Sequence, residues 1–145
     1  NANVSLTLRP SIRLRLDEAY IHSRLVTRSG WQFAPASAAV YNNHVVRTKL
    51  NYQFSREFSF RAIADFNTVL PNTRLVALDP ARKLGYDLLF TYLLHPGTAL
   101  YVGYTDIYEN LSLDPSRPPY LRYTANPDFN TGRQAFVKLS YLFRF

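Results

Sequence analysis

Val137-Lys138-Leu139-Ser140-Tyr141-Leu142-Phe143-Arg144-Phe145 is the stretch that decides the fold. Its last residue, the aromatic Phe145, is also the last residue of the sequence. Every second residue of this stretch is apolar, in the order Val137, Leu139, Tyr141, Phe143 and Phe145. Side chains in a β-strand alternate between its two faces, so these residues form one unbroken apolar row. The alternate positions hold Lys138, Ser140 and Arg144, with Leu142 as an exception. The pattern predicts an amphipathic strand.

This ending resembles the C-terminal strand of bacterial outer-membrane β-barrels. In that class the terminal Phe and the apolar residues before it are read by the barrel-assembly machinery, so the resemblance makes the row from Val137 to Phe145 an assembly signal. Chain ends of soluble domains ordinarily fray into water, so an abrupt aromatic end argues against a soluble domain. The alternative is an edge strand of a soluble β-sandwich binding module.

The composition of the 145 residues fits a barrel and excludes two other classes. Aromatic residues make up 15%, with 11 Tyr and 10 Phe, which suits the aromatic girdles of a membrane barrel. No apolar run approaches the roughly 18 residues of a transmembrane helix, so a helical membrane protein is excluded. Cysteine is absent, which excludes disulfides and thiolate metal sites, and we expect no cofactor.

Period-two segments bounded by turn residues predict seven strands. They cover residues 2–8, 12–26, 39–54, 58–67, 84–94, 99–108 and 134–145. The connections at 9–11, 55–57 and 95–98 are short, whereas those at 27–38, 68–83 and 109–133 are long. Outer-membrane barrels have short periplasmic turns and long external loops. The expected fold class is therefore all-β, an antiparallel transmembrane β-barrel of the bacterial outer membrane.

Strand parity predicts that this barrel is larger than the chain. A single-chain barrel has an even number of strands with both ends in the periplasm. Seven strands that end in the periplasm must begin outside, so we expect residues 1–145 to be the C-terminal part of a barrel domain whose upstream strands are missing. No initiator Met or signal peptide is visible, so either a signal peptide has been removed or the chain is a piece of a longer protein, and the strand count favours the second. One overlooked short strand would instead make the chain a small eight-stranded barrel.

The predicted strands have one apolar and one polar row. The apolar rows, such as Phe58, Phe60 and Phe66, should face lipid. The second strand loses its period at Asp17-Glu18-Ala19, where a β-bulge or emergence above the membrane would account for the break. The polar rows should supply charges to the lumen, namely Arg13, Arg15, Arg47, Lys49, Arg61, Asp65, Asp87 and Lys138.

The formal net charge of +7 does not indicate a nucleic-acid partner, because the basic residues are spread along the strands rather than concentrated beside exposed aromatics. Two interpretations of the lumen charges stay open: a mutually paired interior, and an anion-preferring pore. Lipid bilayer and lipopolysaccharide are the expected partners. Arg24, Arg28 and Arg74 are candidates for the anionic groups of lipopolysaccharide.

Catalysis has little support in the sequence, and whether the protein is an enzyme stays open. His22 and His44 lie on different predicted strands and His95 lies in a predicted turn, and the three have no metal-ligand spacing. Asp65 and Asp87 are better explained as ion-pair partners than as an acid–base pair. The loop at 109–133 is the best candidate for ligand recognition, because its aromatic side chains can stack on an oligosaccharide; these are Tyr120, Tyr123 and Phe129.

Three local strings resemble the C-terminal barrel segment of large bacterial outer-membrane proteins that carry an N-terminal carbohydrate-binding domain of the family-9 type. They are the strings at 50–61, 95–104 and 138–145, including Tyr52-Gln53-Phe54-Ser55-Arg56-Glu57 and Pro96-Gly97-Thr98. The barrel of that family is a domain of unknown function. The resemblance implies an anchor or pore with a link to glycan binding or uptake. The alternative is a barrel anchor for a surface glycan-active enzyme whose catalytic domain lies outside this chain.

Overall fold

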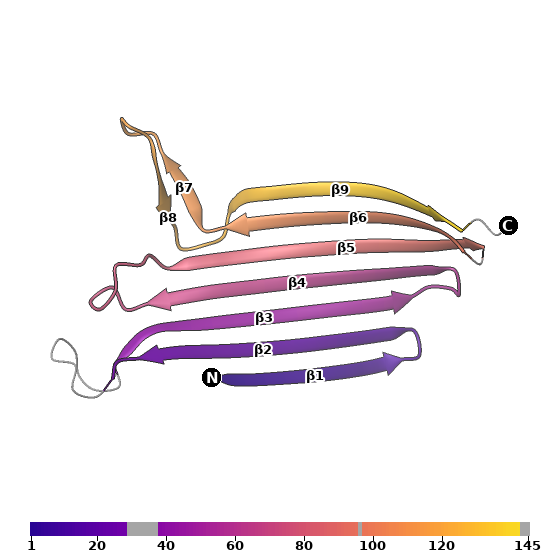
Figure 1. Cartoon of the computed structure of the whole chain (residues 1–145), viewed down its shortest axis with the longest axis horizontal. Helices are drawn as coiled ribbons and strands as arrows, with labels where there is room; N and C mark the ends of the chain where they lie inside the picture. Colours follow the sequence, from indigo (N-terminus) through magenta and orange to yellow (C-terminus); the bar gives the residue numbers. More distant parts are fainter. Residues whose placement is uncertain (29–37, 96, 143–145) are drawn as a thin grey trace.

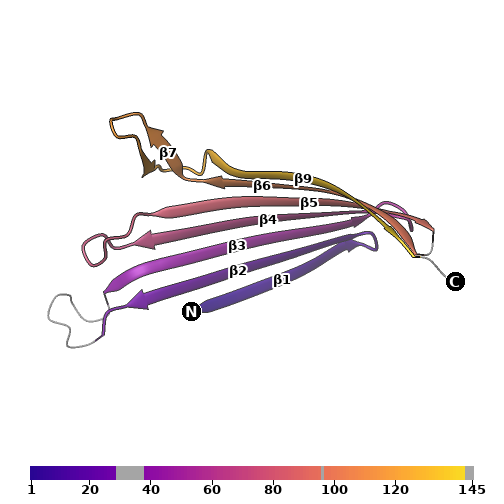
Figure 2. The ribbon, with the colours of Figure 1, turned by 45° about the horizontal axis from the view of Figure 1, so that its top comes forward.

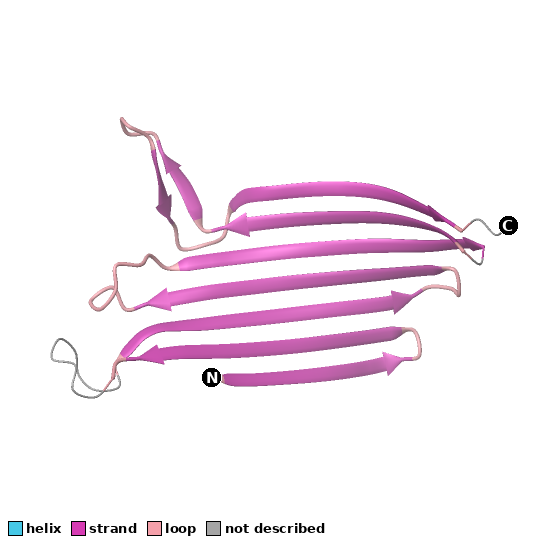
Figure 3. Cartoon of the chain, viewed as in Figure 1, coloured by secondary structure: helices cyan, strands magenta, loops and turns pink. Residues whose placement is uncertain are grey.

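A computed structural model describes residues 1–28, 38–95 and 97–142. The strands of the described residues follow one another along the chain as shown in Figures 1 and 3. Their bounds are β1 (Ala2–Ser11), β2 (Leu14–Val26), β3 (Ala39–Gln53), β4 (Phe58–Pro71), β5 (Ala81–His95), β6 (Thr98–Glu109), β7 (Leu111–Asp114), β8 (Tyr120–Tyr123) and β9 (Phe129–Tyr141). No helix in the described part of the chain is long and apolar enough to cross a membrane.

Seven of these strands form one antiparallel sheet in the order β1-β2-β3-β4-β5-β6-β9. The all-β prediction and its seven long strands are confirmed. Among the described residues, β1 and β9 each pair with one neighbour, so the sheet is open at both edges (Figure 1). The overlooked strands, β7 and β8, form a separate two-stranded hairpin and do not close the sheet.

The connections of the sheet alternate as the sequence predicted. At the end that we call the turn end, short turns join β1 to β2, β3 to β4 and β5 to β6. Ser11 stabilises the first turn, because its Oγ accepts hydrogen bonds from the backbone N–H groups of Arg13 and Leu14. Ser55 acts in the same way on Glu57 and Phe58 in the second. The longer connections and the β7–β8 hairpin lie at the opposite end, the loop end (Figure 1).

Several predicted boundaries were wrong. β4 continues to Pro71 and β9 begins at Phe129, so both adjoining loops are shorter than expected. No bulge interrupts β2 at residues 17–19, because its pairing with β3 is regular from Leu14 to Leu25. The register shifts of β2 lie near its two ends instead, at Leu8/Ser11 and at Leu25/Val26.

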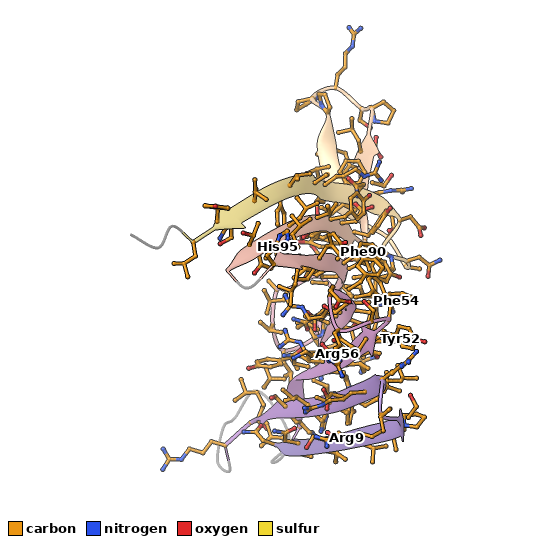
Figure 4. The ribbon with its side chains drawn as sticks, turned by 90° about the vertical axis from the view of Figure 1, so that its right-hand side faces the viewer. Arg9, Tyr52, Phe54, Arg56, Phe90 and His95 are labelled. Carbon is orange, nitrogen blue, oxygen red and sulfur yellow. The ribbon has the colours of Figure 1, made fainter. Side chains whose placement is uncertain are left out.

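The register gives the sheet two chemically different faces. On β4 the apolar face carries Phe58, Phe60, Ala62, Ala64 and Phe66, and their cross-strand partners extend it to both neighbours. Aromatic rings gather on this face near the turn end, where Phe58 stacks on Phe90 with centroids 6.0 Å apart. Figure 4 shows Tyr52, Phe54 and Phe90 on the same side of the sheet. The polar face carries the alternate residues, such as Ser59, Arg61 and Asp65.

Within the described part of the chain, no second layer covers either face of the sheet. Among the described residues, Ala99 is the only hydrophobic side chain that is buried. Large apolar side chains on the apolar face are instead exposed, including Val46, Phe90 and Val102 at 38%, 39% and 42%. The β7–β8 hairpin projects from the loop end and leaves the sheet uncovered (Figures 1 and 2). An extended apolar face is ordinarily buried against another element, and none of the described elements buries this one.

Phe136, an apolar residue that breaks the alternation on the polar face, has a packing reason. Gly103 lies between Leu89 and Phe136 in the register of β5, β6 and β9. The Phe136 ring lies over the glycine, since a Cβ added there would come within 2.1 Å of Phe136 Cε1. An aromatic side chain over a strand glycine replaces the packing that the glycine cannot provide.

Gly103→Ala is therefore expected to destabilise the sheet by about 1–3 kcal/mol, because the added methyl displaces the Phe136 ring. Gly85→Ala is the matched control, since nothing lies within 4 Å of a Cβ built there. Denaturant unfolding of the two variants measures the difference. Equal stability of the two variants would contradict the packing of Phe136 over Gly103.

Candidate functional site

The polar face holds most of the predicted lumen charges, and three of them take part in two ion pairs. Arg15 Nε lies 2.9 Å from Asp17 Oδ2. Arg47 binds Asp65 with both ends of its guanidinium group, with Nε 2.5 Å from Oδ1 and Nη2 3.1 Å from Oδ2. Both pairs are partly solvent-exposed, so each contributes little to the free energy of unfolding. Their main effect is to hold the paired side chains in place on the polar face.

The remaining predicted charges are not in ion pairs within the described residues. Asp87 accepts a hydrogen bond of 2.6 Å from the Thr105 hydroxyl rather than from a cation. Lys49, Arg61 and Lys138 lie on the polar face of β3, β4 and β9. Asp65 and Asp87 are diagonal neighbours on adjacent strands. Each carboxylate has its own partner, which supports a structural role over acid–base chemistry.

One cross-strand row of the apolar face carries polar or charged residues at both of its ends, with Ala64 and Tyr86 between them. Glu18 lies opposite Thr48 on this face and accepts a 2.8 Å hydrogen bond from its hydroxyl. The break at residues 17–19 thus marks a hydrogen-bonded Glu18 within a regular strand. Asp106 and Arg133 occupy the same row on β6 and β9.

Asp106 is the centre of a network in which four side chains donate hydrogen bonds to one carboxylate. It is 5% exposed and accepts hydrogen bonds from Tyr104 (2.8 Å), Tyr108 (3.0 Å), Arg133 Nη2 (3.2 Å) and Asn130. Two of these donors were visible in the sequence, because Tyr104 and Tyr108 stand two residues on either side of Asp106 and share its face. The network ties the loop ends of β6 and β9 together.

The fold also brings two histidines together. His22 and His44 are cross-strand partners on the apolar face, with ring centroids 4.7 Å apart. The Tyr20 hydroxyl lies 2.7 Å from His44 Nδ1. His95 is distant from them, at the turn end of β5. The described residues contain no group of three or more His, Asp or Glu side chains that is arranged to hold a metal ion.

Asn110 fixes the β7–β8 hairpin to the sheet. Its side chain, in a residue that is 1% exposed, accepts a 2.6 Å hydrogen bond from the backbone N–H of Arg82 and donates to the carbonyls of Pro80 (2.8 Å) and Thr124 (2.9 Å). Its backbone N–H also donates to Arg82 O, and its carbonyl accepts from Thr124 N. One residue thereby joins β5, β6 and the end of β8.

The tip of the hairpin is held by Asp114. The side chain and the backbone N–H of Ser116 both donate hydrogen bonds to this carboxylate, and they hold the pKa of Asp114 below its usual value. Hydrogen bonds to the charged form lower a carboxyl pKa in this way. The tip is therefore ordered while Asp114 is ionised and is expected to loosen as the pH falls through that lowered pKa.

The three aromatic residues predicted to bind a ligand do not form one cluster. Tyr120 and Tyr123 lie on opposite faces of the hairpin, because β8 places them three residues apart. Phe129 is the first residue of β9 and pairs with Glu109. Tyr123 lines a cavity of about 220 Å³ at the loop end, which we call the rim cavity, together with Asn67, Lys83, Glu109 and Asn110. Lys83 Nζ and Glu109 Oε1 are 3.6 Å apart there.

The predicted assembly signal is partly within the described residues. Val137, Leu139 and Tyr141 lie on the apolar face of the edge strand β9, with exposed fractions of 71%, 64% and 60%. Phe143 and Phe145 lie outside the described residues. The row is thus presented along an open sheet edge.

These features define a class of structure: a single-layer antiparallel sheet with one apolar face, one charged face and open edges. Comparison with protein-family models, curated proteins and solved structures finds no match to this chain. The resemblance to barrels that accompany a carbohydrate-binding domain therefore stays a prediction.

Proposed function

We propose that this chain is part of a β-barrel of the bacterial outer membrane, with its apolar face against lipid and its polar face toward the barrel interior. The observation that carries the proposal is the exposed apolar face over a sheet without a core. In lipid such a face is buried by the bilayer and needs no second layer. The strands of the sheet have 10–15 residues, which is enough for the roughly 9–11 needed to span a bilayer at a tilt.

The open edges support closure by additional strands. Unpaired backbone groups at β1 and β9 would be costly in hydrocarbon, where water cannot satisfy them. Strands outside these 145 residues would remove both edges and make this chain the C-terminal part of a larger barrel. β9 would then present Val137, Leu139 and Tyr141 to the barrel-assembly machinery before closure.

The loop end suits the cell surface in this arrangement. Arg24 lies beside Asn42 in the register, near the loop end of the apolar face, and the backbone N–H of Arg74 donates to Asn72 Oδ1 in the β4–β5 loop. Both cations would lie at the level of lipopolysaccharide phosphates, which attract basic side chains. The chain thereby serves as an anchor or as part of a pore wall.

Fractionation and gel mobility test the membrane proposal. The full-length protein is expected in the outer-membrane fraction and should run faster on a gel when unboiled than when boiled, because a closed barrel resists detergent. A protein that is extracted by buffer without detergent and shows no heat-dependent shift would contradict the proposal and would favour the soluble binding module.

The rim cavity favours a link to oligosaccharides. It combines one aromatic side chain, Tyr123, with the hydrogen-bonding groups of Asn67, Lys83 and Glu109. An aromatic ring with nearby polar groups suits a sugar, which offers an apolar face and a rim of hydroxyls. This small cavity would hold one sugar ring of a chain that passes the barrel mouth.

Tyr123→Ala is expected to weaken oligosaccharide binding at least about tenfold, which corresponds to roughly 1.4 kcal/mol of lost contact. Tyr120→Ala removes the same side chain from the opposite face of the hairpin and is the matched control. Calorimetric titration with maltohexaose, cellohexaose and xylohexaose measures both. Equal loss in the two variants, or no binding of any of these sugars, would contradict a sugar site in the rim cavity.

A further inference from the structure

A second, larger cavity lies on the polar face at the turn end, far from the rim cavity. Its volume is about 710 Å³, and its lining comes from β1 to β5 and the first turn. Four arginines line it, and the lining contains no Asp or Glu; the arginines are Arg9, Arg13, Arg15 and Arg61. Figure 4 views the sheet from this end and labels Arg9 near the β1 edge. We call it the arginine cavity.

The positive charge of the arginine cavity is largely uncompensated. Of its four arginines, Arg15 is paired with Asp17. Arg9, Arg13 and Arg61 have no ion pair with any described residue, although Arg47 and Lys83 elsewhere on the sheet do. Like charges held close together repel, so such a cluster raises the local affinity for anions. A polar face built only for mutual pairing would not leave three cations unpaired in one hollow.

The register brings the arginines within reach of a single ligand. Arg15 pairs with Asn51, and Asn51 pairs with Arg61, so the two arginines stand two strand spacings apart, about 10 Å. Arg13 precedes Arg15 by two residues at the turn. Neutral hydrogen-bonding groups fill the space between the cations, from Asn51, Gln53, Ser59 and Thr91. Arginine side chains are long and flexible, so from these positions they can reach two anionic groups of one ligand that lie a few ångströms apart.

We propose that the arginine cavity binds a small multivalent oxyanion that carries at least two carboxylate or phosphate groups. The guanidinium group presents a planar fork of donors that matches both of these groups in bidentate fashion. A ligand with two anionic groups engages Arg61 on β4 and the β1–β2 arginines at once, which a monovalent anion cannot do. Acidic oligosaccharides and condensed phosphates are the two sources of this chemistry.

Calorimetric titration of the purified full-length protein tests the site, with pyrophosphate and tri-galacturonate as probes and maltotriose as the neutral control. We expect one or both anions to bind at low salt, maltotriose not to bind at this site, and added salt to weaken anion binding. The variant that combines Arg13→Gln with Arg61→Gln should weaken anion binding at least about tenfold. Lys138→Gln is the matched control, because it removes a cation from the same face outside the cavity. It should change binding less than about twofold.

The outcomes separate the ligand sources and the two proposals. Binding of tri-galacturonate alone would assign the site to carboxylate-bearing sugars, and binding of pyrophosphate alone would assign it to phosphates. Binding of neither anion, or an equal loss in Lys138→Gln, would overturn the proposal. Membrane insertion is measured independently, so anion binding by a protein that fractionates as soluble would sustain this site while contradicting the barrel.

Discussion

Ala62→Arg is expected to destabilise the vesicle-reconstituted protein by about 2–4 kcal/mol, because it places a charge near the middle of the face that we propose to contact lipid. Ala62 is the third of the five residues that form the apolar row of β4, between Phe60 and Ala64. Its partners on either side, Leu50 and Leu88, offer no counter-charge. Equilibrium unfolding in phospholipid vesicles measures the free energy directly.

Ile63→Arg is the matched control. Ile63 is the next residue along β4 and lies on the polar face between Lys49 and Asp87. An arginine there remains in a hydrated, charged environment and can pair with Asp87, so we expect a change below about 1 kcal/mol. A larger penalty for Ile63→Arg than for Ala62→Arg would reverse the assignment of the two faces. Tolerance of both substitutions would indicate that the apolar face meets no lipid.

Asn110→Ala is expected to cost about 2–4 kcal/mol and to release the β7–β8 hairpin from the sheet. The substitution removes three side-chain hydrogen bonds at a fully buried position and leaves the N–H of Arg82 and the carbonyls of Pro80 and Thr124 without this partner. Hydrogen–deuterium exchange is expected to rise across residues 111–124 while the centre of β5 stays protected.

Asn126→Ala serves as the control for that measurement. Asn126 lies in the same connection, is exposed, and its side chain has no hydrogen bond to a described residue. We expect exchange across the hairpin to match that of the unsubstituted protein. Unchanged exchange in Asn110→Ala would show that the hairpin is held by contacts other than the Asn110 network.

Periodicity predicted the sheet well because the rows on β4 and β5 alternate over most of their length. The apolar exception Phe136 could not be explained from its own strand, since its reason is Gly103 on the neighbouring strand. Cross-strand partners depend on the register of the strands, and the register is set by the geometry of the turns and bulges. That geometry is visible in the structure and not in the pattern of a single strand. Prediction from the sequence therefore gave the faces but not the packing.

The candidate sites were predicted less completely. The pairing of Arg47 with Asp65 depends on the register of β3 and β4, which the sequence alone does not reveal. The Asp106 and Asn110 networks include partners more than ten positions away in the sequence. The β7–β8 hairpin was missed because Pro115, Pro118 and Pro119 mark its connection as irregular. Its two strands have four residues each, too few for a clear period.

Site-directed spin labelling along β4 tests the central claim most directly. The chain contains no cysteine, so single cysteines at positions 58–67 can each carry a nitroxide in the vesicle-reconstituted protein. We predict that accessibility to oxygen peaks at Phe58, Phe60, Ala62, Ala64 and Phe66, while accessibility to a water-soluble nickel complex peaks at the residues between them. Equal accessibility of both rows to the nickel complex would contradict a lipid-facing apolar face.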